Sequence, residues 1–239
     1  MATITDILHF ATTNSQFTRK ELIAYLEKQK QTVSPNALSI QLDRLLKNNE
    51  LLRLERGIYR LPATSQRNFI ALISDEIRKL NLQLKEQFPF VNYCVWSSKT
   101  LISYMHHIPN LNHTYIDVER EATESVFRFL NENCNIRVFI CPDSENFDRY
   151  INGTESIIIR TLISEAPLQL LNGFNTPTIE KIMVDVVGDV EFEFIQGSEV
   201  SNFYKNVIEQ HTINNRKLMR YASRRGRRQQ VEDLINKIL

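Results

Sequence analysis

The sequence predicts an α+β protein, with an N-terminal winged helix-turn-helix followed by a mixed α/β domain that has a helical C-terminus. Two capped helical patterns and a glycine-containing hairpin lie within residues 18–61. From about residue 66, apolar strand patterns alternate with helical patterns, and helical patterns fill the end of the chain. We therefore expect two domains, residues 1–62 and 66–239, with a boundary near residues 62–66.

Capping residues mark the start of both helices predicted in the first domain. Thr18 and Glu21 have the spacing of a capping box, in which each side chain accepts a hydrogen bond from the other residue's backbone amide. Ser34 and Pro35 suit the N-cap and the first position of the second helix, where proline's missing N–H costs nothing. Two short apolar runs follow, and the three residues between them, Glu55-Arg56-Gly57, predict a hairpin.

The polar face of the second helix favours contact with DNA. Apolar residues lie on one stripe of this helix, and the opposite face carries asparagine, arginine and lysine. A hairpin with three arginines follows at once, which is typical of groove and phosphate contacts made together. A small helical subdomain with a hairpin lid, or a winged helix that binds protein, remains an alternative. The candidate DNA-binding residues are Arg19, Lys20, Ser34, Asn36, Ile40, Arg44, Lys47, Arg53, Arg56 and Arg60.

Charge is distributed unevenly, although the formal net charge is +1. Residues 1–61 hold 9 lysines and arginines against 6 acidic residues, and residues 62–210 hold 12 against 20. Residues 211–239 hold 8 against 2. Each contact between a basic side chain and a phosphate releases counterions, which favours binding. The charge distribution therefore suggests that both basic ends face nucleic acid, while the acidic middle faces protein or solvent.

The basic C-terminal segment predicts a helix followed by a second amphipathic helix. Leu218, Tyr221 and Ala222 recur at helical spacing, and Gly226 suits a C-cap. The basic side chains are a candidate second nucleic-acid contact. Pairing with the acidic middle of the chain, or partner binding, remains an alternative. The residues concerned are Arg216, Lys217, Arg220, Arg224, Arg225, Arg227 and Arg228.

Helical and strand patterns alternate between the two basic ends. Helices are expected at residues 65–88, 97–106, 121–133 and from Thr176-Pro177 onward. Strands are expected at residues 91–96, 114–118, 136–141 and 156–162. Residues 191–195 fit either a continuing helix or a short strand.

Several protein classes are disfavoured by composition and motifs. No apolar run approaches the ~20 residues that span a bilayer, and the first ten residues lack the basic residue of a signal peptide. Cys94, Cys134 and Cys141 lie in apolar runs without a CxxC pair, which indicates reduced core residues of a cytoplasmic protein. No phosphate-binding glycine loop or GxSxG motif occurs, and the adjacent His106 and His107 point to different sides of a helix. We expect no catalytic residue, metal or cofactor.

One enzymatic alternative rests on carboxylates at strand ends. Asp117 and Glu119 close one predicted strand, and Asp143 follows another. Clustered carboxylates of this kind hold magnesium in metal-dependent nucleases. The alternative function is therefore a metal-dependent nucleic-acid-processing enzyme, although ordinary acidic residues at strand ends explain the same pattern.

Three segments of the chain resemble the AbiEi-type antitoxins of bacterial type IV toxin–antitoxin systems. They read LLRLERGIYRLP at residues 51–62, NTPTIEKIMVDVVGD at residues 175–189 and INNRKLMRYASRRGR at residues 213–227. The resemblance implies an N-terminal domain that binds inverted repeats at its own promoter as a repressor. It also implies a C-terminal domain that counteracts a nucleotidyltransferase-like toxin, with no stable complex required.

The same resemblance assigns residues to these roles. Base recognition would fall on Asn36, Ser39, Ile40, Arg44 and Lys47, and contact by the wing on Arg56. In the C-terminal domain it singles out three motif positions only, and for these we expect an ion pair on a helix surface with Ile182 and Val186 facing the core. The three positions are Glu180, Lys181 and Asp185.

Overall fold

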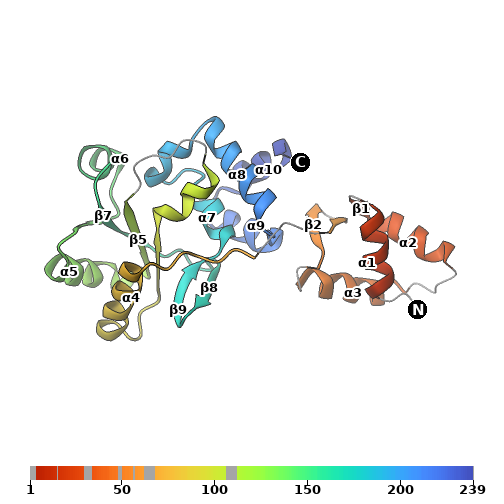
Figure 1. Ribbon diagram of the computed structural model, residues 1–239, viewed down its shortest axis with the longest axis horizontal. Coiled ribbons are helices and arrows are strands. Elements are labelled where there is room, and N and C mark those ends of the chain that lie inside the picture. Colours follow the sequence, from red (N-terminus) through yellow and green to blue (C-terminus); the bar gives the residue numbers. More distant parts are fainter. Residues whose placement is uncertain are drawn as a thin grey trace. The chain divides into compact units, whose positions relative to one another are not determined.

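The computed structural model is an α+β protein that divides into two compact units (Figure 1). It describes residues 4–14, 16–29, 34–47, 50–55, 57–61, 68–105 and 112–238. The first unit comprises Met1–Asn68 and Ile208–Arg216, and the second comprises Phe69–Val207 and Lys217–Leu239. The division near residue 68 lies close to the boundary expected from the sequence. The packing of residues 208–216 with the first unit was not expected.

Short helices and a three-stranded antiparallel sheet form the first unit. The strand order is β1-β3-β2, so that β3 lies in the middle. Helix α1, which the sequence analysis did not predict, places Ile7 and Ala11 in the apolar core of the unit. The elements are α1 (Ile4–Thr13), β1 (Phe17–Thr18), α2 (Arg19–Lys28), α3 (Pro35–Lys47), β2 (Leu52–Glu55) and β3 (Ile58–Arg60).

The local sequence signals of the first unit are confirmed, with one change in the hairpin. The Thr18 hydroxyl accepts from the Glu21 amide at 3.2 Å, and the Glu21 carboxylate accepts from the Thr18 amide at 2.6 Å. Helix α3 begins at Pro35 as predicted. Between β2 and β3 only residues 56–57 remain, one fewer than the predicted three. Gly57 there has a φ of 84°, which glycine adopts without strain.

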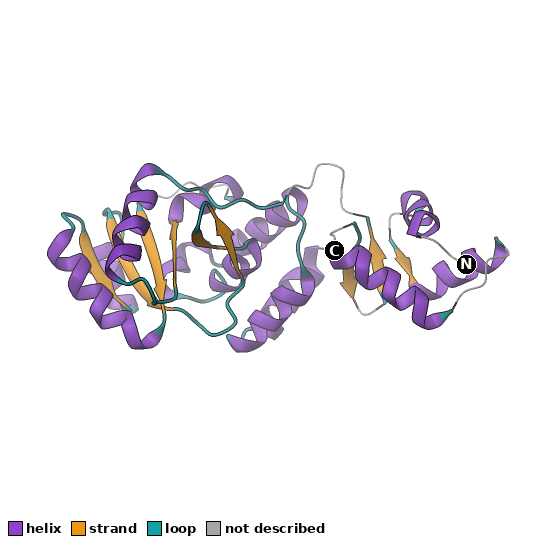
Figure 2. Ribbon diagram, turned by 90° about the horizontal axis from the view of Figure 1, so that it is seen from below, coloured by secondary structure: helices purple, strands orange, loops and turns teal. Residues whose placement is uncertain are grey.

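A four-stranded mixed sheet forms the centre of the second unit, with helices on both sides (Figure 2). The strand order is β4-β5-β7-β6; β4 runs antiparallel to β5, whereas β7 is parallel to both β5 and β6. All four strands were predicted to within two residues at each end. They are β4 (Tyr93–Ser97), β5 (His113–Val118), β6 (Arg137–Ile140) and β7 (Ser156–Thr161).

The pleat of β5 separates the two faces of this sheet. Ile116 and Val118 point to an apolar core that also contains buried side chains from helices α4 and α5. Asp117 points the other way and meets helix α7, which is buried along its whole length. Helices α8 and α9 of this unit extend into the first unit. The helices of the unit are α4 (Asp75–Gln87), η1 (Ser98–Tyr104), η2 (Arg120–Ala122), α5 (Thr123–Asn133), α6 (Ser144–Asn146), η3 (Phe147–Ile151), α7 (Ile179–Asp185), η4 (Val190–Ile195), α8 (Ser198–Gln210), α9 (Asn215–Arg224) and α10 (Arg228–Ile238).

A two-stranded hairpin precedes α7 where the sequence was expected to start a helix. Strands β8 (Leu168–Leu171) and β9 (Phe174–Pro177) are joined by Asn172 and Gly173, both with positive φ, of 52° and 80°. This is the geometry of a type I′ turn, which Asn-Gly favours. The prediction that Thr176-Pro177 begins a helix is therefore wrong, because both residues belong to β9 and Thr178 is the N-cap of α7.

The helix expected over residues 65–88 is shorter in the structure. Residues 65–67 lie outside the described part, and α4 begins only at Asp75, where the Ser74 hydroxyl accepts from the Ile77 amide. Between them the chain is not helical, and its side chains are alternately buried and exposed, as in an extended segment. The predicted helix is therefore wrong for residues 68–74, whose buried residues have the period of two of an extended chain.

Three further expectations are resolved by the structure. The helix predicted at 97–106 is the 3-10 helix η1, and residues 191–195 belong to the 3-10 helix η4 rather than to a strand. Gly226 follows α9 with a φ of 67°, as its predicted C-cap role requires. In the described part of the chain, no helix has both the length and the apolar character needed to cross a membrane.

Candidate nucleic-acid interface and a buried charge cluster

Helix α3 has one buried face and one exposed face. Leu38, Leu42 and Leu45 pack into the core of the first unit. Asn36 and Arg44 are exposed on the opposite side, together with Ile40, whose side chain is 70% exposed. The open face of α3 thus carries a large aliphatic residue between polar ones.

The start of α3 is held by the start of α2. The guanidinium of Arg19 donates to the carbonyl of Pro35 at 2.8 Å. The backbone amide of Arg19 donates to the carbonyl of Gly57 at 3.0 Å. Arg19, predicted as a phosphate contact, therefore positions α3 and the hairpin. Lys20 beside it is exposed. Ser39, assigned to base recognition by resemblance, is half-buried and donates to the carbonyl of Pro35 at 2.9 Å.

The hairpin arginines lie in different surroundings. Arg53 is exposed, and its backbone carbonyl accepts a 2.8 Å hydrogen bond from the side-chain amide of Asn215. Arg60 is half-buried, and this burial lowers the pKa of its guanidinium. Arg56 lies outside the described residues, and nothing is described of the Lys47 side chain at the end of α3. Ser34 is exposed immediately before α3.

A cluster of buried charges lies between the sheet and α7 in the second unit. The Lys181 ammonium is 2.6 Å from the Asp185 carboxylate and 2.7 Å from the Asp117 carboxylate, and all three side chains are at most 3% exposed. Glu180 is also buried. The expectation of an ion pair on a helix surface is therefore wrong, because α7 is covered on every side.

Arg160 of β7 extends this charge cluster across the sheet. Its guanidinium is 2.7 Å from Asp117 and 3.4 Å from Asp185. It also lies over aromatic rings, with its central carbon 4.8 Å from the ring centroid of Tyr115 and 5.5 Å from that of Phe192. The carboxylates and the aromatic rings offset part of the free-energy cost of removing the Arg160 guanidinium from water, so that it stays charged.

The turn between α9 and α10 supplies two more cations. Arg225 pairs with Asp189 and lies 3.4 Å from Asp185. Arg227 is 2.7 Å from Asp189 and donates to the carbonyl of Gly188 at 3.1 Å. Gly188 has a φ of 118°, and the Arg227 guanidinium lies 3.8 Å from the point where a Cβ would stand. The hydroxyl of Tyr221 completes the cluster by donating to Asp185 at 2.9 Å.

The pKa values of the cluster follow from burial and from the opposing charges. Burial alone would raise the pKa of Asp185, but Lys181 and Arg160 together lower it to about 2. Burial would lower the pKa of Lys181, but Asp117 and Asp185 raise it above its usual value. Both groups are therefore charged at neutral pH.

Comparison with known proteins identifies the family. A model described as "Family of unknown function (DUF6577)" matches residues 37–239. The chain belongs to the DUF6577 family. No curated protein matches the chain. The matched span begins inside α3 and contains the hairpin and every residue of the charge cluster, so the family pattern includes part of the candidate DNA-binding surface and the whole cluster.

The C-terminal basic residues of this DUF6577 chain do not form one surface. Arg225 and Arg227 belong to the charge cluster, as described above. Arg220 pairs with Glu165 at 2.8 Å, and Arg224 lies 3.9 Å from the same carboxylate. Arg228 pairs with Glu232 on its own helix. Arg216 belongs to the first unit, whereas Lys217 is the first residue of the last segment of the second unit. The alternative of pairing with acidic residues from the middle of the chain thus holds for four of the seven basic residues, namely Arg220, Arg224, Arg225 and Arg227.

The carboxylates of the enzymatic alternative have separate partners. Asp117 is held in the cluster, Glu119 accepts from the Asn92 amide at 3.1 Å, and Asp143 caps α6 through the Asn146 amide at 2.8 Å. Among the described residues, no group of three or more His, Cys, Asp or Glu side chains has the arrangement of a metal site. His106 and His107 lie outside these residues.

The cysteines are only partly as expected. All three are free, and Cys94 is buried, where burial raises the pKa of its thiol. Cys134 is half-buried and Cys141 is exposed, so the expectation of three core residues is wrong for Cys141. Cys141 directly follows β6 with a φ of 41°, and its backbone amide still donates to the carbonyl of Ile159 in β7 at 2.8 Å.

Proposed function

We propose that the chain is a DNA-binding autorepressor and antitoxin of a type IV toxin–antitoxin operon, and that its first unit is a winged helix. The observation that carries the DNA-binding part is α3, which is anchored by leucines on one face and exposes Asn36, Ile40 and Arg44 on the other. The order of helices and hairpin strands is the one that a winged helix uses to place such a helix in the major groove.

In this proposal, α3 reads sequence and its neighbours set the register. Asn36 can accept from and donate to an adenine edge, and Ile40 can contact a thymine methyl. Lys20 and Arg53 are exposed and contribute contacts to phosphate. Arg44, to which the resemblance assigns base recognition, lies about two turns beyond Asn36 and contacts phosphate in this proposal, because the N-terminal residues of a recognition helix reach the bases. Arg19 contributes indirectly, because its hydrogen bond to Pro35 fixes the start of α3. A single unit of this size covers few base pairs, so two copies on an inverted repeat are expected.

The test is a gel-shift titration on the DNA upstream of the gene, performed at two salt concentrations. We expect a discrete shift that unrelated duplex does not compete away and that weakens as salt rises, because phosphate contacts release counterions. Equal affinity for every duplex, or no binding, would contradict the repressor. For the antitoxin part, expression of the neighbouring gene alone should arrest growth and co-expression of this chain should relieve the arrest.

A further inference from the structure

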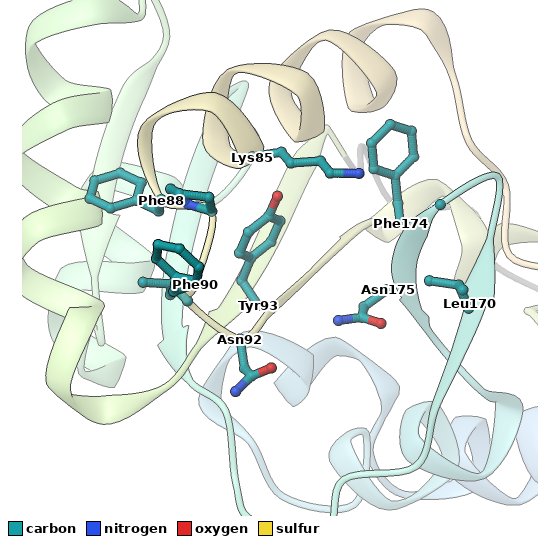
Figure 3. A pocket seen from close by; sticks show the side chains of 11 residues that line it. Lys85, Phe88, Phe90, Asn92, Tyr93, Leu170, Phe174 and Asn175 are labelled. Carbon is teal, nitrogen blue, oxygen red and sulfur yellow. The ribbon is translucent and has the colours of Figure 1, made fainter.

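A pocket of about 220 Å³ lies in the second unit, between the end of α4 and the β8–β9 hairpin (Figure 3). Aromatic rings from both sides line it: Phe88 and Tyr93 on one side, and Phe174 on the other. The tight Asn-Gly turn of the hairpin places Phe174 directly after Gly173. The pocket is thus built by elements about 80 residues apart in the sequence.

Two apolar side chains on the rim of the pocket are left open to solvent. Phe90 is 95% exposed and Leu170 is 74% exposed. Scattered exposed apolar residues are ordinary, but these two flank a pocket that also contains three aromatic rings. A ligand that covered both rim residues would have to extend beyond the pocket itself.

The polar groups of the pocket favour a negatively charged group. Lys85 is the one charged residue in the lining, and no carboxylate of the described chain pairs with it. In Figure 3 its side chain extends across the pocket toward Phe174, and the amide of Asn175 lies below it. The amide of Asn92 donates to Glu119 and is therefore already occupied. A carboxylate at the pocket would pair with Lys85 and with the Asn175 amide.

We propose that this pocket binds an acidic–aromatic segment of a partner protein, with one aromatic or leucine side chain inserted among the rings and an adjacent carboxylate on Lys85. The pocket is smaller than the roughly 300–1,000 Å³ of small-molecule sites, and a single side chain fills it. A polyanion is disfavoured, because Lys85 is the one charged residue in the pocket lining and can pair with a single carboxylate only. The inference is independent of DNA binding by the first unit.

The experiment is an NMR titration of the full-length ¹⁵N-labelled protein with three peptides. The probes are acetyl-Gly-Glu-Phe-Leu-Gly-amide and the two peptides in which glutamine or lysine replaces the glutamate. We expect the glutamate peptide to shift amides of residues 85–93 and 170–175 and to bind more tightly than the other two. Lys85→Gln should make the glutamate and glutamine peptides equivalent. Phe90→Ala should weaken binding about fivefold or more.

The control variant is Tyr150→Ala, which removes another exposed ring, 51% accessible and outside the pocket lining, and should leave binding unchanged. No shifts with the glutamate peptide, or equal binding of the lysine peptide, would overturn the proposal. It would also be overturned if oligothymidylate shifted the same amides and the peptides did not. A fall in sedimentation coefficient on Phe90→Ala would overturn it as well, by showing that a second copy of the chain covers the patch.

Discussion

Asn36 and Arg44 are both exposed on α3 but have different expected contributions to DNA binding. Asn36→Ala should remove a base contact and relax sequence preference by about 1–3 kcal/mol, because the bidentate contact to adenine is lost. Arg44→Ala should weaken binding to all duplexes alike. Competition gel shifts with operator and unrelated DNA measure both effects. Arg78→Ala, on an exposed position of α4, is the matched control, and an Asn36→Ala variant with unchanged preference would contradict the groove assignment.

Asp185 makes the free energy of unfolding of the second unit depend on pH in the acid range. Its pKa in the folded protein, about 2, is below the ordinary value of 3.8, so the native state binds its proton less readily than the unfolded state. The resulting stabilisation, of about 2 kcal/mol, is complete above pH ~4 and is lost as the pH falls toward 2. Urea unfolding from pH 5 to 2 should show this loss in the wild type.

The Asp185→Asn variant isolates this contribution from those of other acidic residues. It should be less stable at pH 7, because Lys181 and Arg225 lose a charged partner, and the difference from the wild type should narrow below pH 4. A difference that stays constant from pH 7 to 2 would show that folding does not lower the pKa of Asp185.

At the scale of elements, the junction of α9 and α10 offers a matched pair of arginines, Arg227 in the turn and Arg228 at the first position of α10. Arg227 contacts Asp189 and the carbonyl groups at the end of α7, whereas Arg228 pairs with Glu232 on the exposed face of α10. Arg227→Met should cost about 2–4 kcal/mol, because Asp189 is left under-compensated in a largely buried site. Arg228→Met should cost less than about 0.5 kcal/mol. Equal midpoints for the two variants in urea unfolding would show that the cluster does not anchor this turn.

Elements with local signals could be predicted, and those fixed by distant contacts could not. The capping box at Thr18 and the proline at the start of α3 act within one turn of helix, so the sequence showed both. The β8–β9 hairpin also has a local signal, because Asn172-Gly173 favours a type I′ turn. The burial of α7 had none, because Lys181 and Asp185 have the i,i+4 spacing of a surface ion pair, and Asp117 is 64 residues away from Lys181.

The candidate site was predictable in part for the same reason. The exposed face of α3 followed from helical periodicity, which also gave its buried leucines. The role of Arg19 in holding Pro35, and the half-burial of Arg60, depend on how α2 and the hairpin pack. The rim of the pocket at Phe90 and Leu170 depends on tertiary contacts between β4 and strand β9 of the hairpin, which periodicity does not report.

At the scale of the whole molecule, the first unit is assembled from two separated parts of the chain. Residues 208–216 group with residues 1–68, and Asn215 is hydrogen-bonded to the backbone of β2. A fragment of residues 1–68 should therefore melt several degrees lower than a fragment in which residues 208–216 are fused to it by a flexible linker. Circular dichroism measures both, and equal melting temperatures would show that the late segment contributes no stability.

The charge cluster also has a consequence for synthesis. On the ribosome, Asp185 emerges 40 residues before Arg225, and Arg227 follows 38 residues after Asp189. Until then Asp185, at the end of α7, and Asp189, just beyond it, have only Lys181 and Arg160 as partners among the cations of the cluster, so burying them is costly. We therefore expect the second unit to close around α7 only when the last two helices are available, which makes it a late and all-or-none folding step rather than one that follows the order of translation.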